Sequence, residues 1–452
     1  MERDTQSMRP FFVVWVGQLV SVVGTGLTAF GLIVWTYLET GSVTALAFVS
    51  LLTALPATVL SPVAGAYVDR WDRRITMLVA DVAAGLATLV VAILFFSDSL
   101  ALWHVYLLSG IGSVANAFQQ PAWLATIPLI VPKEHLGRAN GLVQTNEALS
   151  MIAAPAIAGA LLATVGLGGI LIADGVTFAI GVLTLASVRF PTHERTDVAD
   201  SGRVLDDVRV GWRYLRARTG LFYLLFVYAG VNFVLAFANV LFVPMVLAFA
   251  SESAAGTLMT VAGFGMLVGS VVVGAWGGPK RLVRGTMTGI ALAGLTVALA
   301  GLRPSLPLIG VGVFLLMLGI PVVNVASQTL WQRKVAPGVQ GRVFALRRTF
   351  AQIAAPLAIV LTGPLADGVF EPLLAEGGAL AGSVGSIIGT GDGRGIGFMI
   401  VLIGLATTLL GVLGYAHPRI RHAESELADE LPEGAPVASV VPIAEPLPDP
   451  AV

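Results

Sequence analysis

Long stretches without Asp, Glu, Lys or Arg constrain this chain more than any other feature of its sequence. They run over 10–38, 40–68, 82–97, 99–132, 148–173, 175–188, 219–251, 253–279, 285–302, 304–332, 349–366 and 396–418. A helix needs about 20 apolar residues to cross a bilayer, and most of the stretches supply them. Two shorter ones reach that length once the single acids Asp81 and Asp174 are included. The sequence therefore predicts an all-α integral membrane protein.

The composition excludes several other classes of protein. Charged residues make up 12% of the chain, about half of the ~25% usual in globular domains. The net charge of −1 provides no basic field for nucleic acid. The absence of cysteine excludes disulfides, thiolate metal sites and cysteine nucleophiles. The first apolar stretch is too long for a signal peptide and has no A-x-A-like cleavage site, so we expect it to stay as the first helix.

The basic residues predict which side of the membrane each connecting segment faces, because short cytoplasmic loops retain Lys and Arg. Turns placed near 40, 72, 98, 134, 167, 203, 252, 281, 303, 337 and 380 give twelve helices. With the N-terminus inside, 24 of the 26 basic residues lie on inner segments, and only Arg303 and Arg394 lie on outer ones. We therefore expect twelve transmembrane helices with cytoplasmic N- and C-termini.

An internal repeat divides the chain into two halves. The pattern N-x-x-[QS]-Q-x-x-W begins at Asn116 and recurs at Asn324, 208 positions later. Similar offsets relate three further pairs: Pro132 with Pro337, Gly137-Arg138 with Gly341-Arg342, and Gly65-Ala66-Tyr67 with Gly274-Ala275-Trp276. Parallel six-helix repeats with a site between them are typical of transporters.

The repeat predicts the domain organisation. The halves are expected at 1–188 and 219–416, with a cytoplasmic linker at 189–218 and a disordered acidic tail at 417–452. Within the linker, residues 203–218 have apolar side chains at helical spacing. They are compatible with a helix on the membrane surface or with a solvated connector helix.

Polar side chains inside the predicted helices indicate a substrate pathway. Residues at i, i+3, i+4 and i+7 share one helical face, and amides facing lipid are costly. Asn116, Gln119, Gln120 and Trp123 form one such stripe, which should therefore face protein or a water-filled cavity. The alternative is that its amides only bond neighbouring helices. The predicted cavity residues are Gln18, Asn116, Gln119, Gln120, Asn232, Asn324 and Gln328.

Residues 65–74, GAYVDRWDRR, resemble the signature between helices 2 and 3 of the major facilitator superfamily. The segments 121–142, 331–346 and 361–367 resemble its bacterial efflux branch, which holds the enterobactin exporter and macrolide efflux proteins. This resemblance implies the twelve-helix major facilitator fold and a cytoplasmic gate. The gating residues would be Gly65, Asp69, Arg70, Arg73 and Arg74. Alternatively, the arginines only set the orientation in the membrane.

Two further details bear on the resemblance. The second copy of the signature, at 274–281, lacks the acid of the first, so gate locking there is not expected. In the fifth helix, Pro155-Ala-Ile-Ala-Gly159 resembles the core of a Gly/Pro-rich pattern that exporters of the superfamily carry.

The sequence contains no motif for chemical catalysis. It has no G-x-x-x-x-G-K-[ST] phosphate loop, and the glycine-rich run 389–397 has no preceding strand. Its five histidines form no ligand pair or triad. We therefore expect no enzyme, no cofactor and no metal site, and an ion gradient as the energy source.

Glu147 is the acid that lies deepest in a predicted helix. It is about 13 Å from a helix start near Arg138, at 1.5 Å per residue, and shares a face with Asn140 and Gln144. A carboxylate in a low dielectric tends to hold its proton, so Glu147 is the predicted proton-coupling residue. A purely structural hydrogen bond is the alternative.

These observations and the resemblance together predict a secondary active transporter of the bacterial cytoplasmic membrane. It would export small amphipathic or hydrophobic compounds, such as an antibiotic, a siderophore or a related metabolite, by proton antiport with alternating access. We expect it to work as a monomer in the bilayer. The alternatives are a nutrient-uptake symporter of the same fold and a non-transporting membrane sensor.

Overall fold

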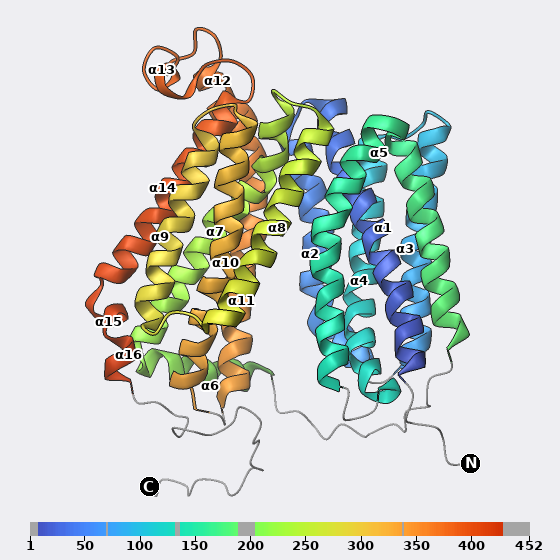
Figure 1. Ribbon diagram of the computed structural model, residues 1–452, viewed down its shortest axis with the longest axis horizontal. Helices are drawn as coiled ribbons and strands as arrows, with labels where there is room; N and C mark the ends of the chain where they lie inside the picture. The colour runs from blue at the N-terminus through green and yellow to red at the C-terminus, as the bar shows by residue number, and fades with distance from the viewer. Residues whose placement is uncertain (1–7, 69–70, 132–135, 189–203, 337–338, 428–452) are drawn as a thin grey trace, which may run out of the picture.

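The computed structural model describes residues 8–68, 71–131, 136–188, 204–336 and 339–427, and these residues are helices joined by turns (Figure 1). The first half contains α1 (Arg9–Thr40), α2 (Val43–Val68), α3 (Arg73–Phe96), α4 (Leu102–Ile130) and α5 (Leu136–Ser187). The second half contains α7 (Thr219–Leu247), α8 (Glu252–Trp276), α9 (Leu282–Gly301), α10 (Leu306–Lys334), α11 (Gln340–Leu365) and α14 (Arg394–Ala416). The prediction of an all-α chain is confirmed over these residues.

Shorter elements complete the described chain. The linker contains α6 (Val204–Ala217). A π-helical turn, η3 (Ala366–Phe370), follows α11 and leads into α12 (Glu371–Leu374) and α13 (Gly385–Ile388). After α14 come α15 (Pro418–Arg421) and α16 (Ala423–Glu426). The elements α12 and α13 mark the upper end of the molecule in Figure 1, and α6 lies at the lower end.

Ten helical segments of the described chain are long and apolar enough to cross a membrane. One of them covers Ile152–Ser187 within α5, whose 52 residues fold back on themselves at Gly166. Gly166 has φ 67° and ψ −172°, a conformation that is open to glycine but strained for residues with a Cβ. It separates two antiparallel arms, which Figure 1 shows turning at the upper end.

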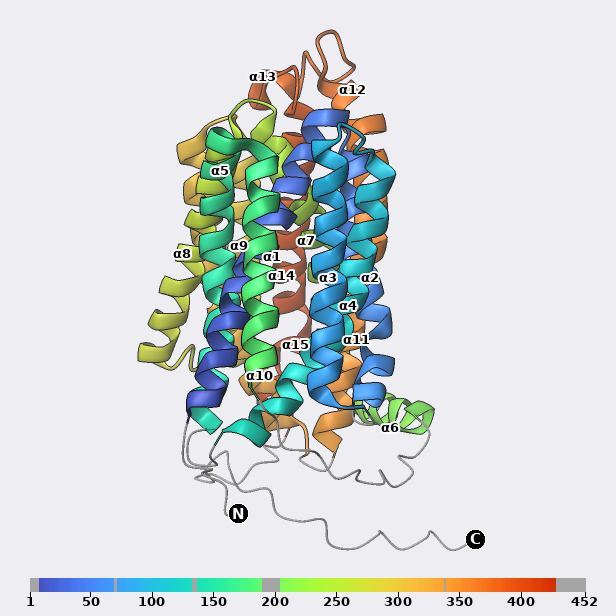
Figure 2. The same ribbon diagram turned by 90° about the vertical axis from the view of Figure 1, so that its right-hand side faces the viewer.

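The linker helix α6 packs on the second half instead of standing apart from it (Figure 2). Leu215 is fully buried in a core with residues of α7, α10 and α11. Trp212 stacks on Phe350 of α11 with ring centroids 5.7 Å apart. The predicted helix is therefore present, and Trp212 and Leu215 of its apolar face pack on the second half.

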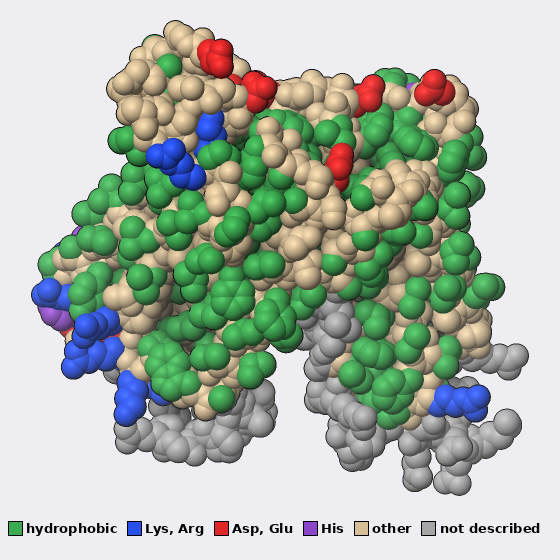
Figure 3. Space-filling view, turned by 45° about the horizontal axis from the view of Figure 1, so that its top comes forward, with side chains coloured by type: hydrophobic (Ala, Val, Ile, Leu, Met, Phe, Trp, Pro, Cys, Tyr) green, Lys and Arg blue, Asp and Glu red, His purple; other side chains and the backbone are tan. Residues whose placement is uncertain are grey.

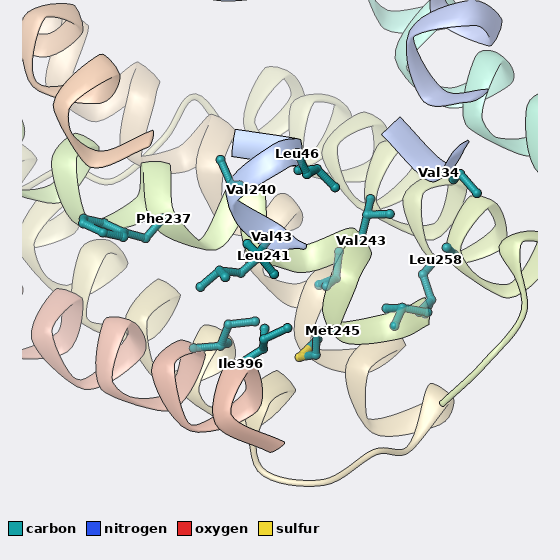
Figure 4. Close-up of a cluster of buried hydrophobic side chains, with 14 of the residues drawn as sticks. Val34, Val43, Leu46, Phe237, Val240, Leu241, Val243, Met245, Leu258 and Ile396 are labelled. Carbon is teal, nitrogen blue, oxygen red and sulfur yellow. The ribbon is translucent and has the colours of Figure 1, made fainter. Parts of the chain in front are cut away.

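The two halves share a hydrophobic core at the upper end. Val34, Val43 and Leu46 of the first half pack there with Leu241 and Ile396 of the second (Figure 4). These residues come from the last turns of α1 and α7 and from the first turns of α2 and α14. Because side chains of both halves exclude water together, this core holds the halves against each other.

At the lower end each half has a core of its own. Phe11, Met77 and Ile127 belong to a cluster made entirely of first-half residues. Met287 and Leu346 belong to a second cluster, made of the second half and α6. The halves are thus joined at the upper end and packed independently at the lower end.

Small residues allow close approach where α5 and α8 meet across the halves. A methyl group on Gly256 would fall on the carbonyl oxygen of Pro155, and one on Gly159 would lie 3.3 Å from the Cα of Ser253. One on Gly263 would lie 2.5 Å from the Cγ1 of Ile152. The Pro155–Gly159 segment therefore forms part of the contact between the halves.

Gly256→Ala should destabilise the protein, because the added methyl group must push α5 away from α8. Overpacking of this kind costs about 1–3 kcal/mol. The matched control is Gly274→Ala in the same helix, where a methyl group would meet nothing within 4 Å. Thermal unfolding of the purified proteins should show a lower Tm for Gly256→Ala only. Equal Tm values for both variants would contradict this contact.

Candidate functional site

The repeated stripe on α4 divides into exposed and buried side chains. Asn116 and Gln120 are exposed, whereas Gln119 is half-buried. Trp123 is buried and stacks on Phe11, with ring centroids 6.0 Å apart and planes 11° from parallel. The stripe thus faces two environments, with its amides at the surface of the bundle and its indole in the lower core.

The matching stripe on α10 divides in the same way. Asn324 and Gln328 are exposed. Ser327, which takes the place of Gln119, is 1% exposed, and Trp331 is fully buried. The repeat read from the sequence therefore extends to the surroundings of each side chain.

The exposed amides lie away from the shared core, toward the lower end. On α10, Ile309 and Val313 belong to that core, and Asn324 and Gln328 follow three to five turns later toward the lower end. The same spacing on α4 places Asn116 and Gln120 at an equivalent depth. All four amides therefore lie at the depth where the halves are packed independently.

The other face of α4 is apolar. Leu107, Ile111 and Val114 are exposed there and line a groove of about 1080 Å³ between α2, α3 and α4. Leu107 and Asn116 are nine positions apart, which places them on opposite sides of the helix. An apolar face suits lipid and an amide face suits water, so α4 is amphipathic across the predicted pathway.

In the first half, the stripe is connected to a buried acid. The Nε2 of Gln119 donates to the Oε1 of Gln18 at 2.6 Å, and the Nε2 of Gln18 donates to the Oδ2 of Asp81 at 3.1 Å. Gln18 is 4% exposed and Asp81 is 7% exposed. Gln18 was predicted to line the cavity. In the structure its side chain lies between Gln119 of α4 and the carboxyl group of Asp81 in α3, and it bonds to both.

In the second half, the stripe is connected to a guanidinium group. Arg347 of α11 donates to the Oε1 of Gln328 at 3.1 Å and to the Oγ of Ser327 at 2.7 Å. Its guanidinium carbon lies 5.1 Å from the ring centroid of Trp331 and 5.4 Å from that of Tyr228, within cation–π range.

From the sequence, Arg347 is one of the basic residues on the inner segments and has no predicted site. In the structure it lies seven residues into α11, about 10 Å from the helix start. A signal was present in the sequence, because the pair Arg347-Arg348 lies at the start of a charge-free stretch that follows the second stripe. The two copies of the stripe therefore differ in charge, with an acid behind the first and a cation beside the second.

Asp174 is the second buried acid of the first half. Its Oδ2 accepts hydrogen bonds from the hydroxyls of Thr28 at 2.7 Å and Thr88 at 3.3 Å, and its Oδ1 from Thr177 at 3.3 Å. Gly24 of α1 leaves the space that Thr177 and Asp174 fill. Three helices, α1, α3 and α5, thus supply hydroxyl donors to one carboxyl group. The hydrogen bond from Thr28 explains why this polar residue lies inside α1.

Asn232, the cavity residue predicted on α7, is exposed, and so is Asn239 of the same helix. Asn232 donates to the carbonyl oxygen of Tyr228 at 2.9 Å, one turn earlier on the same helix. Tyr228 also faces Arg347. Asn232 therefore lies near the second-half stripe, whereas Asn239 is two turns further toward the shared core.

The predicted gate is described only in part. Asp69 and Arg70 lie outside the described residues, as does the side-chain environment of Gly65. Arg74 donates from its Nη2 to the carbonyl oxygen of Ala186, near the end of α5, and Arg73 is half-buried. The arginines thus follow α2 and begin α3 at the lower end.

The predicted coupling residue is not described either. The side chains of Asn140, Gln144 and Glu147 lie outside the described part of the chain, although their helix α5 is described. Among the described residues, no group of three or more His, Asp or Glu side chains is placed to hold a metal ion.

Comparison with known proteins gives consistent results. Residues 14–359 match the Major Facilitator Superfamily. Macrolide efflux protein A of Streptococcus pyogenes is 30% identical over 377 residues, which cover 82% of this chain and 92% of that protein. Multidrug efflux pump Tap of Mycobacterium bovis (strain BCG / Pasteur 1173P2) is 28% identical over 378 residues, covering 79% and 87%.

Solved structures share the fold. A bacterial homologue of the iron transporter ferroportin, in an inward-facing state, aligns with a TM-score of 0.69 at 16% identity, covering 93% of this chain and all of that one. A bacterial homologue of the human lysosomal transporter Spinster, inward-facing and unoccupied, aligns with a TM-score of 0.66 at 16% identity, covering 93% and 97%.

These relatives and the ten apolar helices define a multi-pass protein of the bacterial cell membrane. It is a transporter and not an enzyme. The family match spans residues 14–359, which is most of the chain, and the alignment with macrolide efflux protein A covers 92% of that protein. The chain belongs to the Major Facilitator Superfamily, on the branch that holds bacterial macrolide and multidrug efflux transporters.

Proposed function

We propose that this transporter exports amphipathic or hydrophobic compounds from the cytoplasm, with antibiotics as the first class to test. The observation that carries the proposal is the 30% identity to macrolide efflux protein A over 92% of that protein. The pathway would run between the halves, where Asn116, Gln120, Asn324 and Gln328 are exposed. Four amides and one guanidinium beside apolar helices suit a large, mostly apolar compound with a few polar groups.

The proposed topology has twelve crossings, with the lower end and both termini in the cytoplasm. The ten apolar segments support it, together with the 29-residue α4 and the two arms of α5. The upper rim carries acidic side chains, and most Lys and Arg of the face shown in Figure 3 lie lower down. Basic residues on the lower side agree with the preference of cytoplasmic loops. The halves at 1–188 and 219–416 would act as the two moving bodies of a monomer.

The proposed mechanism is alternating access. The halves are joined at the upper end by the shared core and packed independently below, the arrangement expected when the pathway opens to the cytoplasm. Substrate would enter from that side, and rocking of the halves would then open the upper end. The loop 65–74 would lock the lower end in the alternate state, with Asp69 bonding to arginines only when that end is closed.

Proton antiport is the proposed energy source. Glu147 is the proposed carrier, because it shares a helical face with Asn140 and Gln144. Asp81 offers a second carboxyl group, connected through Gln18 to the stripe residue Gln119. This connection would let a substrate at the stripe alter the surroundings of a proton-exchanging group.

Drug export from cells tests the function directly. Expression in a bacterium that lacks its own efflux pumps should raise the inhibitory concentration of macrolides or other amphipathic antibiotics and lower their accumulation. Collapse of the proton gradient should abolish both effects. Secretion of a siderophore or metabolite without drug resistance would move the substrate to that class. Increased uptake of a nutrient would support the symporter instead.

Gln120→Leu and Gln328→Leu should each alter drug affinity or the range of drugs exported by several-fold, because each removes one amide of the pathway with little change of volume. The matched control is Thr288→Val, which removes an exposed hydroxyl of α9 that is not part of either stripe. Transport assays should use equal amounts of membrane-inserted protein. If both glutamine variants and the control transport alike, the amides do not line the pathway.

Glu147→Gln should fold and bind drug but lose accumulation driven by a pH gradient, because an amide keeps the shape of the carboxyl group and cannot carry its proton. The measurement is drug uptake into inverted vesicles with an imposed pH gradient, with drug binding as the control. A Glu147→Gln protein that transports at the wild-type rate would exclude Glu147. A loss in Asp81→Asn alone would transfer the role to Asp81.

A further inference from the structure

One acid of the second half binds the beginning of a helix in the first half. The Oδ2 of Asp367 accepts from the Oγ of Ser42 at 2.9 Å, the backbone N of Thr44 at 2.9 Å and the Oγ1 of Thr44 at 2.8 Å. Its Oδ1 accepts from the backbone N of Val43 at 3.1 Å. Four donors from three consecutive residues thus point at one carboxyl group more than 320 positions away in the chain.

This arrangement caps α2 from outside its own half. The first N–H groups of a helix have no partner inside the helix, and a carboxylate that accepts from them also interacts favourably with the helix dipole. Within the first half, the Oγ of Ser42 accepts from the N of Ala45 at 3.3 Å. The N–H groups of Val43 and Thr44 are bonded to the second half.

The pseudo-equivalent helix α8 is capped within its own half. Ser251, 209 positions after Ser42, accepts from the N of Ala254 at 3.3 Å as the N-cap of α8. Both helices start against a glycine of the other half: α8 against Gly159 and α2 against Gly363, 204 positions later. The glycine contact therefore occurs twice, and the acid is added at only one of the two places.

We propose that the cap made by Asp367 on α2 is the charged element that holds the upper end of the transporter closed. The inference rests on the alternating-access part of the proposed function. The cap joins η3 to the first turn of α2, beside Val43 in the shared core (Figure 4). Moving α2 away from α11 breaks four hydrogen bonds at once, so the bonds exist in one state of the transporter only.

Asp367→Asn tests the charge of this cap. An amide presents one acceptor oxygen, and its NH₂ group would face N–H donors where the carboxylate accepted. N-caps and charge-assisted bonds of this kind correspond to roughly a five- to tenfold shift in a two-state equilibrium. We therefore expect the ratio of upper-open to upper-closed molecules to rise about five- to tenfold.

The natural absence of cysteine makes the measurement direct. Spin labels on Ser97→Cys, after α3, and Ser305→Cys, before α10, report the distance between the halves at the upper end. Double electron–electron resonance of the full-length protein in nanodiscs gives the populations of the short and long distances. The long distance should gain population in Asp367→Asn. It should not gain in Asp392→Asn, which removes an exposed carboxylate at the same end.

Further variants separate a gating role from a purely structural one. Asp367→Glu keeps the charge and should restore part of the closed population. Thr44→Val removes one donor and should shift the populations in the same direction. Added to Asp367→Asn, it should have little further effect, because the two groups share one interaction.

The distance measurement tests the cap, and the drug-export assay tests the proposed function, so either can fail without the other. Unchanged distance populations in Asp367→Asn, or in Thr44→Val if the former does not fold, would overturn the cap. A shift toward the long distance supports the cap even if no drug is exported. In that case the assignment as a drug exporter fails and the cap stands.

Discussion

The hydrophobic core shared by the two halves at the upper end is the interaction on which the rest of the structure depends. It draws residues from helices of both halves, including α1, α2 and α5 of the first and α7, α8, α10 and α14 of the second, whereas each lower core belongs to one half. Apolar burial is non-directional, so this core joins the halves without fixing how far their lower ends separate. The close α5–α8 contact and the hydrogen bonds accepted by Asp367 have a specific geometry, and they fix how the halves are oriented at the same end.

Duplication explains why the two stripes have the same pattern of exposed and buried side chains, and loss of symmetry explains why their bonding partners differ. Asn116 and Asn324 occupy equivalent exposed positions, and Trp123 and Trp331 occupy equivalent buried ones. The partners behind the stripes differ, with Asp81 in the first half and Arg347 in the second. A transporter built from two identical halves would have the same charge on both sides. In this chain the stripe of the first half is instead bonded to an acid network and that of the second half to a guanidinium group.

Many of the helices and the internal repeat could be predicted from the sequence, because charge-free length and the positive-inside preference are local properties of the chain. Helix positions, the repeat and the exposure of Gln120 and Gln328 depend on such properties. The partner of Gln18 could not be predicted, since helical periodicity gives a face and not the neighbour that packs on it. The hydrogen bonds that Thr44 donates to Asp367 join segments 323 positions apart, so only the assembled halves reveal them.

On the proposed mechanism, the exposed amides are reached from the cytoplasm while the upper end is closed. Single cysteines at Gln120 and Gln328 test it most directly, because the natural chain has no cysteine to react in the background. A membrane-impermeant maleimide should label both positions in inverted vesicles and leave them largely unlabelled in right-side-out vesicles. Labelling only in right-side-out vesicles, or no labelling from either side, would contradict the account.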